Sequence, residues 1–73
     1  MTLETLTLQE IVRFANSGDI DTAQFGQRAI RLITLAAYRE PTDEQLRETI
    51  NLDKVLRKDL VNPAFVAHIR KGI

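Results

Sequence analysis

DTAQFGQRAIRLITLAAYR, residues 21–39, is the longest stretch of the chain in which apolar side chains recur with a helical period. On a helical wheel most of its apolar and small residues fall within about half of the circumference. This half consists of Phe25, Gly26, Ala29, Ile30, Leu32, Ile33, Ala36 and Ala37. The pattern predicts a long central helix that buries this half in the core. A glycine inside a helix costs about 1 kcal/mol relative to alanine, so Gly26 and the alanines indicate close approach of another backbone.

The opposite side of this helix is polar, but not uniformly so. Three arginines lie there, with one leucine and one tyrosine among or beside them. Because arginine and tyrosine are enriched at protein interfaces, we predict a partner-binding surface on this side. Its residues are Arg28, Arg31, Leu35, Tyr38 and Arg39. The alternative is a solvated surface on which Leu35 is covered by the N-terminal segment or by the last helix.

A capping signal defines a helix upstream. Thr7 and Glu10 have the spacing of a capping box, which predicts a helix over residues 8–16 that ends at an Asn-Ser-Gly turn. The apolar side chains that this helix is expected to bury are Leu8, Ile11, Val12 and Ala15. Residues 1–6 lack a helical stripe, and they are predicted to be extended or frayed.

The central helix has its own boundary signals. Asp21, followed three residues later by Gln24, is predicted to cap it, so that the helix begins at residue 22. Pro41 is predicted to end it at residue 39. Proline disfavours helical geometry at the residue before it and has no N–H for the next hydrogen bond.

Two further helices are predicted downstream. A capping box at Thr42 opens a helix over residues 43–61, and asparagine followed by proline opens another over residues 63–71, with Gly72 as its stop. The third helix has apolar residues on two sides. It either breaks near Asn51 or runs on continuously, and we favour the continuous helix. The side chains outside its main stripe then need cover from the last helix or from a second chain, and these are Leu52 and Val55.

The predicted fold is therefore all-α: a compact bundle of four helices, over about 8–16, 22–39, 43–61 and 63–71, joined by short loops. No segment alternates with period two over a useful length, so no strand is predicted. The whole chain, residues 1–73, is expected to form a single helical domain.

The length and the net charge of the chain limit the classes of function that it can have. A chain of 73 residues builds a core worth only about 3–5 kcal/mol, and oligomerisation is a common supplement. We therefore expect a homodimer, with Leu52 and Val55 as candidate dimer contacts. Ten basic and ten acidic residues cancel, so the net charge favours neither nucleic acid nor an anionic membrane. The longest apolar run, Leu35–Tyr38, is far too short to span a bilayer and no signal peptide is recognisable, so a cytoplasmic location is expected.

Few residues could support chemistry. The chain has no cysteine and one histidine, His68, for which the sequence supplies no positioned catalytic partner. The densest group of carboxylates lacks the loop of a calcium site, and it is interpreted as a solvated helix start. This group is Glu40, Asp43, Glu44 and Glu48. No catalytic residue, cofactor or metal is predicted.

The leading hypothesis is a small non-enzymatic accessory protein, of the adaptor or inhibitor type, that regulates by protein-protein binding as a homodimer. The alternative is a DNA- or RNA-binding regulator. Its first two helices resemble the order of a helix-turn-helix, although Asp19 and Asp21 stand at the start of the presumed recognition helix. A second nucleic-acid option uses basic residues of the C-terminal part, namely Lys54, Arg57, Lys58, Arg70 and Lys71.

Overall fold

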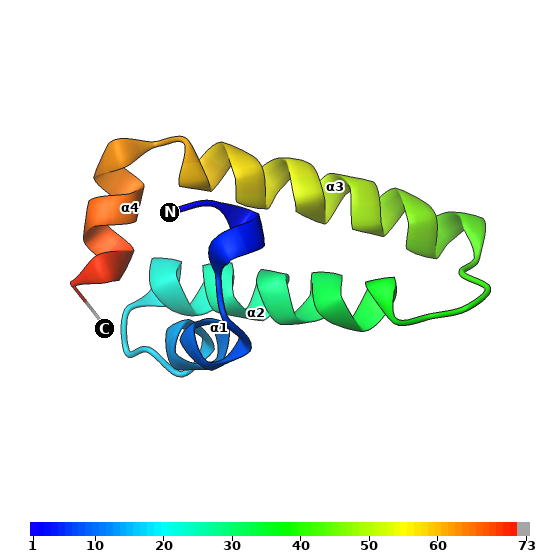
Figure 1. The fold of residues 1–73 in the computed structure, drawn as a ribbon, viewed down its shortest axis with the longest axis horizontal. Helices are drawn as coiled ribbons and strands as arrows, with labels where there is room; N and C mark the ends of the chain where they lie inside the picture. Colours follow the sequence, from blue (N-terminus) through cyan, green and yellow to red (C-terminus); the bar gives the residue numbers. More distant parts are fainter. Residues whose placement is uncertain (72–73) are drawn as a thin grey trace.

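Four α-helices and one short 3-10 turn form the fold in the computed structural model, which describes residues 1–71 (Figure 1). The elements are η1 (Leu3–Thr5), α1 (Leu8–Ala15), α2 (Ile20–Ala36), α3 (Asp43–Leu60) and α4 (Pro63–Arg70). No strand occurs among these 71 residues. The predicted all-α bundle of four helices is confirmed.

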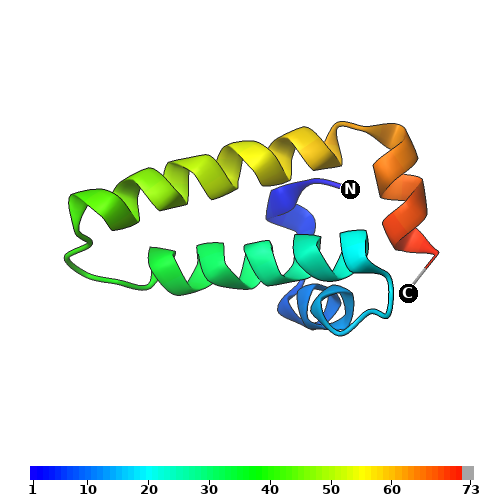
Figure 2. The ribbon, with the colours of Figure 1, turned by 180° about the vertical axis from the view of Figure 1, so that it is seen from behind.

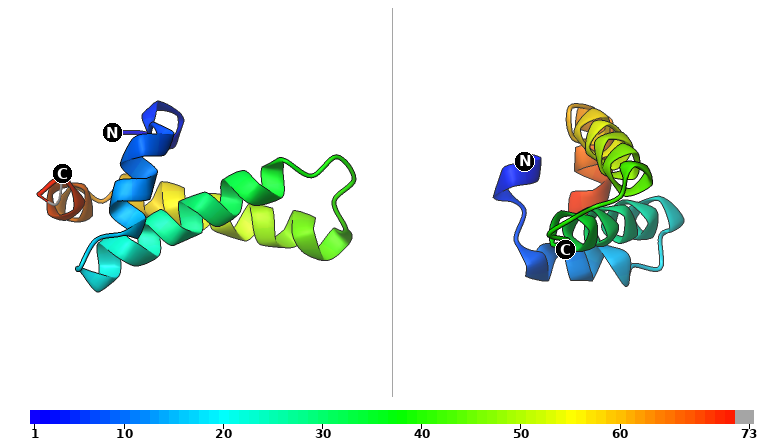
Figure 3. Two further views of the ribbon diagram at one scale, coloured as in Figure 1. Left: turned by 90° about the horizontal axis from the view of Figure 1, so that it is seen from below. Right: turned by 90° about the vertical axis from the view of Figure 1, so that its right-hand side faces the viewer.

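The two long helices, α2 and α3, form an antiparallel hairpin along the long axis of the molecule (Figures 1 and 2). α4 closes the end of this hairpin that lies away from the connecting loop, residues 37–42. α1 lies against α2 on the side away from α3, and Figure 1 shows it almost end-on while α2 runs across the view. η1 lies beside the α2–α3 layer (Figure 3, right). The helices are therefore concentrated at one end of the hairpin.

Side-chain caps fix three of the four helix starts as predicted. The Thr7 hydroxyl accepts from the Glu10 N–H at 3.1 Å, and the Glu10 carboxylate accepts from the Thr7 N–H at 3.0 Å. Thr42 forms the same reciprocal pair with Gln45. Asn62 caps α4, with proline at the first helical position, where its missing N–H has no consequence.

The start of α2 differs from the prediction. Asp19, not Asp21, is the cap, and α2 begins at Ile20. The Asp19 carboxylate accepts from both the N–H and the hydroxyl of Thr22, at 3.0 and 2.9 Å. A threonine at the third helical position thus gives this aspartate two bonds, which explains why it is the one that caps the helix.

The ends of the four helices differ from the predicted ones by one to three residues, and the N-terminal segment differs in kind. α2 ends at Ala36, because the chain must reverse toward α3 before Pro41, which keeps the preceding residue out of helical geometry. α3 runs unbroken from Asp43 to Leu60, so the continuous helix is confirmed. Residues 3–5 form a 3-10 turn instead of an extended lead, closed by hydrogen bonds between Thr2 and Thr5. The predicted stop at Gly72 lies outside the described residues.

Aromatic side chains from three helices meet in the core. Phe25 of α2 is fully buried, and its ring centroid lies 5.8 Å from that of Phe14 and 5.5 Å from that of Phe65. The buried cluster consists of Ile11, Phe14, Phe25, Ala29, Leu56, Leu60 and Ile69. Ile11 is buried as predicted. Leu8 and Val12 were also predicted to be buried, and this is wrong, because α1 turns Phe14 toward the core in their place.

Gly26 is the point at which α1 crosses α2. A Cβ atom at this position would lie 2.7 Å from the Ala15 Cα and the Phe14 carbonyl carbon. The close approach of a second backbone, predicted from this glycine, is therefore confirmed.

The predicted core face of α2 is correct only in its first half. Thr22, Phe25, Gly26 and Ala29 are buried, but Ile30, Ile33, Ala36 and Ala37 are exposed, and Leu35 is 2% exposed. The reason is that α1 packs only on the first half of α2 (Figure 3, left). Beyond that point, α3 is the only long helix beside α2, so Leu35 is the buried side chain there.

Candidate functional site

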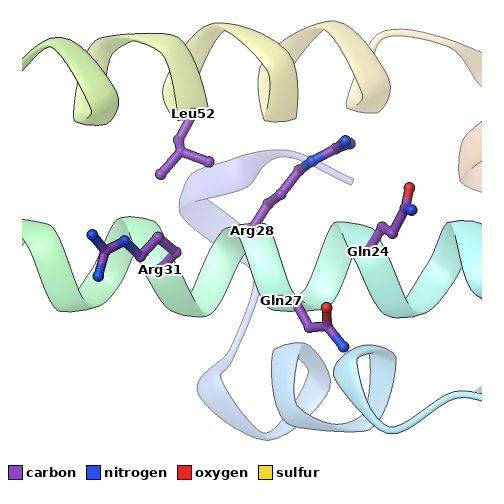
Figure 4. Close-up of a pocket in the computed structure, with 5 residues that line it drawn as sticks. All are labelled: Gln24, Gln27, Arg28, Arg31 and Leu52. Carbon is purple, nitrogen blue, oxygen red and sulfur yellow. The ribbon is translucent and has the colours of Figure 1, made fainter.

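A shallow groove runs between α2 and α3 on the side away from η1, and we name it the back groove (Figure 4). It has a volume of about 280 Å³. Its lining residues are Gln24, Gln27, Arg28, Arg31 and Leu52. Four of them come from three successive turns of α2, and Leu52 comes from α3 opposite.

The two arginines of the back groove differ in their partners. Arg31 forms a bidentate pair with Glu48 of α3, and hydrogen bonds from its guanidinium lower the pKa of that carboxyl. Arg28 makes no ion pair within residues 1–71. Its guanidinium extends from α2 toward α3 in Figure 4. The groove therefore presents one cation that is not already neutralised.

The structure places the predicted partner-binding residues in three separate environments. Arg28 and Arg31 lie in the back groove. Leu35 is buried, so its predicted exposure is wrong, because α2 turns this residue into the molecule. Tyr38, which is 46% exposed, and Arg39 follow the end of α2 and lie in the loop. The five residues thus do not form one continuous surface.

The predicted dimer contacts lie near the same groove. Leu52 is half-buried and lines it, and Val55, one helical turn later on α3, is 39% exposed. Residues three apart on a helix share a face. Leu52 therefore shares the groove with Arg28, and Val55 lies on the same face of α3 one turn later.

A second cluster lies where α4 meets the start of α2. His68 Nε2 lies 2.8 Å from Asp19 Oδ2, in a hollow of about 220 Å³ that Ser17, Thr22 and Lys71 also line. Hydrogen bonds from the Thr22 backbone, from His68 and from the Thr22 hydroxyl lower the pKa of Asp19 to about 2. The two residues are separated by 49 positions, so no local pattern in the sequence could have predicted their contact.

The geometry of this cluster fits a structural role best. Ligand atoms of Asp19, Asp21 and His68 lie within 4.8 Å of one another. However, Asp19 Oδ2 is already within hydrogen-bonding distance of three partners, and the positive end of the α2 dipole disfavours a cation there. The Ser17 hydroxyl accepts from the Asp19 N–H and makes no hydrogen bond to His68 among the described residues. The contact thus ties α4 to α2.

The features considered for nucleic-acid binding are partly occupied by internal contacts. α2, the presumed recognition helix, packs against both α1 and α3, and its first turn lies beside His68. Arg57 pairs with Glu4 and Asp53. Lys54 and Lys58 remain on the exposed side of α3, one turn apart.

Comparison with protein-family models, curated proteins and solved structures found no match to this chain. None of the helices in residues 1–71 combines the length and apolar character needed to cross a bilayer. The function is therefore inferred from the chemistry of the surface alone.

Proposed function

We propose that this chain is a non-enzymatic interaction protein, of the adaptor or inhibitor type, whose partner-binding site is the back groove. The observation that supports the proposal is the position of Arg28. It is an arginine without an ion-pair partner in residues 1–71, and it shares the groove with the half-buried Leu52. Arginine next to apolar side chains is typical of residues that dominate binding energy at interfaces.

The chemistry of the groove indicates the class of partner. A protein segment that presents a carboxylate to Arg28 and an apolar side chain to Leu52 and Val55 would match it. Gln24 and Gln27 offer amide donors and acceptors for the backbone of such a segment. Small-molecule sites are usually enclosed and about 300–1,000 Å³ in volume, so a shallow groove of about 280 Å³ suits a protein surface better.

Exchange of one charge tests this site. Arg28→Glu should abolish capture of a partner from the native host, because the groove would then repel the partner's carboxylate. Lys54→Glu is the matched control, since it makes the same charge change at an exposed position of α3 outside the groove. Capture that depends on Arg28 and not on Lys54 supports the proposal. Equal capture by both variants contradicts it.

The second candidate function is DNA or RNA binding, which Lys54 and Lys58 on the exposed side of α3 support. Phosphate contacts give an affinity that falls steeply with salt. Retention on heparin that Lys54→Glu abolishes and Arg28→Glu leaves intact would favour this candidate over the groove. A cytoplasmic, regulatory role is part of the leading proposal.

A further inference from the structure

Residues 1–6 are fastened to the four helices by side chains alone, and we name this segment the strap. Its hydrogen bonds run between Thr2 and Thr5 and close the 3-10 turn η1 on itself. The polar link from the strap to the helices is an ion pair between Glu4 and Arg57 of α3. Among residues 1–71, no backbone hydrogen bond joins the strap to the helices.

The apolar side chains of the strap lie against the hairpin. A 3-10 helix has three residues per turn, so Leu3 and Leu6 lie on one side of it. These two leucines and Met1 are half-buried and pack against the core cluster. η1 contacts α3. Figures 1 and 2 show it crossing the α2–α3 pair, and Figure 3 (right) shows it outside that layer. The strap thus covers part of the core from outside.

The four helices form a complete body without the strap. Each of them contributes at least one side chain to the buried core cluster, and the strap contributes none. α1 begins with its own capping box, between Thr7 and Glu10, directly after the strap ends. Rotation of the backbone between Leu6 and Thr7 therefore releases the strap and leaves the α1 cap and the buried cluster in place.

The ion pair that holds the strap is of a kind that opens readily. The Arg57 side chain is 50% exposed and that of Glu4 is 61% exposed, and exposed ion pairs contribute little to stability. Hydrogen bonds from Arg57 and from its own backbone lower the pKa of the Glu4 carboxyl, so the pair is charged at neutral pH. Arg57 also pairs with Asp53, one turn earlier on α3. It therefore keeps a partner when Glu4 leaves.

We propose that the strap is a tethered ligand, which occupies a docking face on the hairpin until a protein segment of the same pattern replaces it. The present occupant specifies the chemistry of that segment. It carries two leucine-like side chains three positions apart and a carboxylate directly after the first, as in Leu3, Glu4 and Leu6. The core cluster receives the apolar side chains, and Arg57 receives the carboxylate.

The tether makes the strap an autoinhibitor of this face. A short linker gives a tethered ligand an effective concentration of about millimolar. A free segment with the same few contacts therefore competes poorly while the strap is closed. A protein that offers further contacts, or a chain whose strap is weakened, overcomes this competition.

Thiol labelling tests whether the strap opens, and the absence of cysteine makes the experiment clean. In the Leu3→Cys chain, Arg57→Gln should raise the rate of reaction with a maleimide about two- to fivefold, because it removes an exposed ion pair. Arg47→Gln is the matched control, since Arg47 is exposed on the same helix and makes no ion pair within residues 1–71. Equal labelling in both backgrounds overturns the role of the ion pair.

A peptide with the sequence of residues 1–6 tests the docking face. The full chain with Leu3→Ser and Leu6→Ser has a strap that no longer packs. It should bind the peptide at least about tenfold more tightly than the wild type does, because each half-buried leucine contributes to closure. Chemical shift changes at Arg57, followed by NMR up to millimolar peptide, measure this binding. Leu3→Ser alone replaces the double variant if circular dichroism shows that the double variant unfolds.

Two controls define the chemistry of the face. A peptide with serine in place of both leucines should not bind. Adding Arg57→Gln to the open-strap variant should weaken binding of the original peptide, and adding Arg47→Gln should not. No peptide binding by a folded open-strap variant, or equal binding by this variant and the wild type, overturns the proposal. The strap face and the back groove lie on opposite sides of the α2–α3 layer, so the two sites can fail independently.

Discussion

Gly26 is the residue on which the packing of α1 depends. Gly26→Ala should destabilise the fold by about 1–3 kcal/mol, because the new methyl group meets the backbone of Phe14 and Ala15, which cannot rotate away. This cost exceeds the gain of about 1 kcal/mol in helix propensity. Urea unfolding measures the change. Gly18→Ala is the control, since open space surrounds that position and its backbone is not left-handed. A neutral Gly26→Ala would contradict the close crossing.

Asp19 is the residue that should make stability depend on acid. Its pKa is about 2 in the folded protein and 3.8 in the unfolded reference, so its carboxylate contributes stability above pH 3.8 that is lost as the pH falls toward 2. Asp19→Asn keeps a capping side chain but removes the titration. The difference in unfolding free energy between wild type and variant should shrink between pH 4 and pH 2. A constant difference across that interval would show that this carboxyl titrates alike in both states.

Among the helices, the stability of the first turn of α3 should depend on its N-cap, Thr42. Thr42→Ala removes the acceptor of the Gln45 N–H and should cost about 1 kcal/mol. Faster amide hydrogen exchange should appear in the first turn of α3, because the buried core cluster lies at the other end of this helix. Thr34→Ala, in the exposed interior of α2, is the control. Equal exchange in the first turn of α3 in both variants would show that packing, not the cap, holds it.

Helix by helix, the sequence predicts most of what depends on neighbouring residues. The capping boxes at Thr7 and Thr42 and the asparagine cap of α4 were predicted correctly, because a cap is a contact between residues three or fewer positions apart. The cap of α2 was misplaced by two residues. Both aspartates fit the local pattern, and Asp19 is distinguished by its two hydrogen bonds from Thr22 and by its contact with His68.

At the scale of the whole molecule, the errors share one cause. The exposed fractions of Leu35, Ile30 and Ile33 depend on where α1 ends along α2, and periodicity alone does not specify that point. The residues of the candidate site were predicted separately and not as one site, because periodicity does not specify how the helices pack together. Arg28 and Leu52 were singled out separately, each from its own helix, and only the hairpin brings them to one groove. The contact of Asp19 with His68 spans 49 residues and left no sequence signal.

The position of the core also has a mechanical consequence. Phe25, Leu56 and Ile69 belong to a core that lies at one end of the hairpin, so the other end extends beyond this core. A contact made at the 37–42 loop is transmitted to the core only through α2 and α3. We therefore expect the backbone amides at the end that contains the core to exchange more slowly than those near the 37–42 loop, where fewer buried apolar side chains support the hairpin.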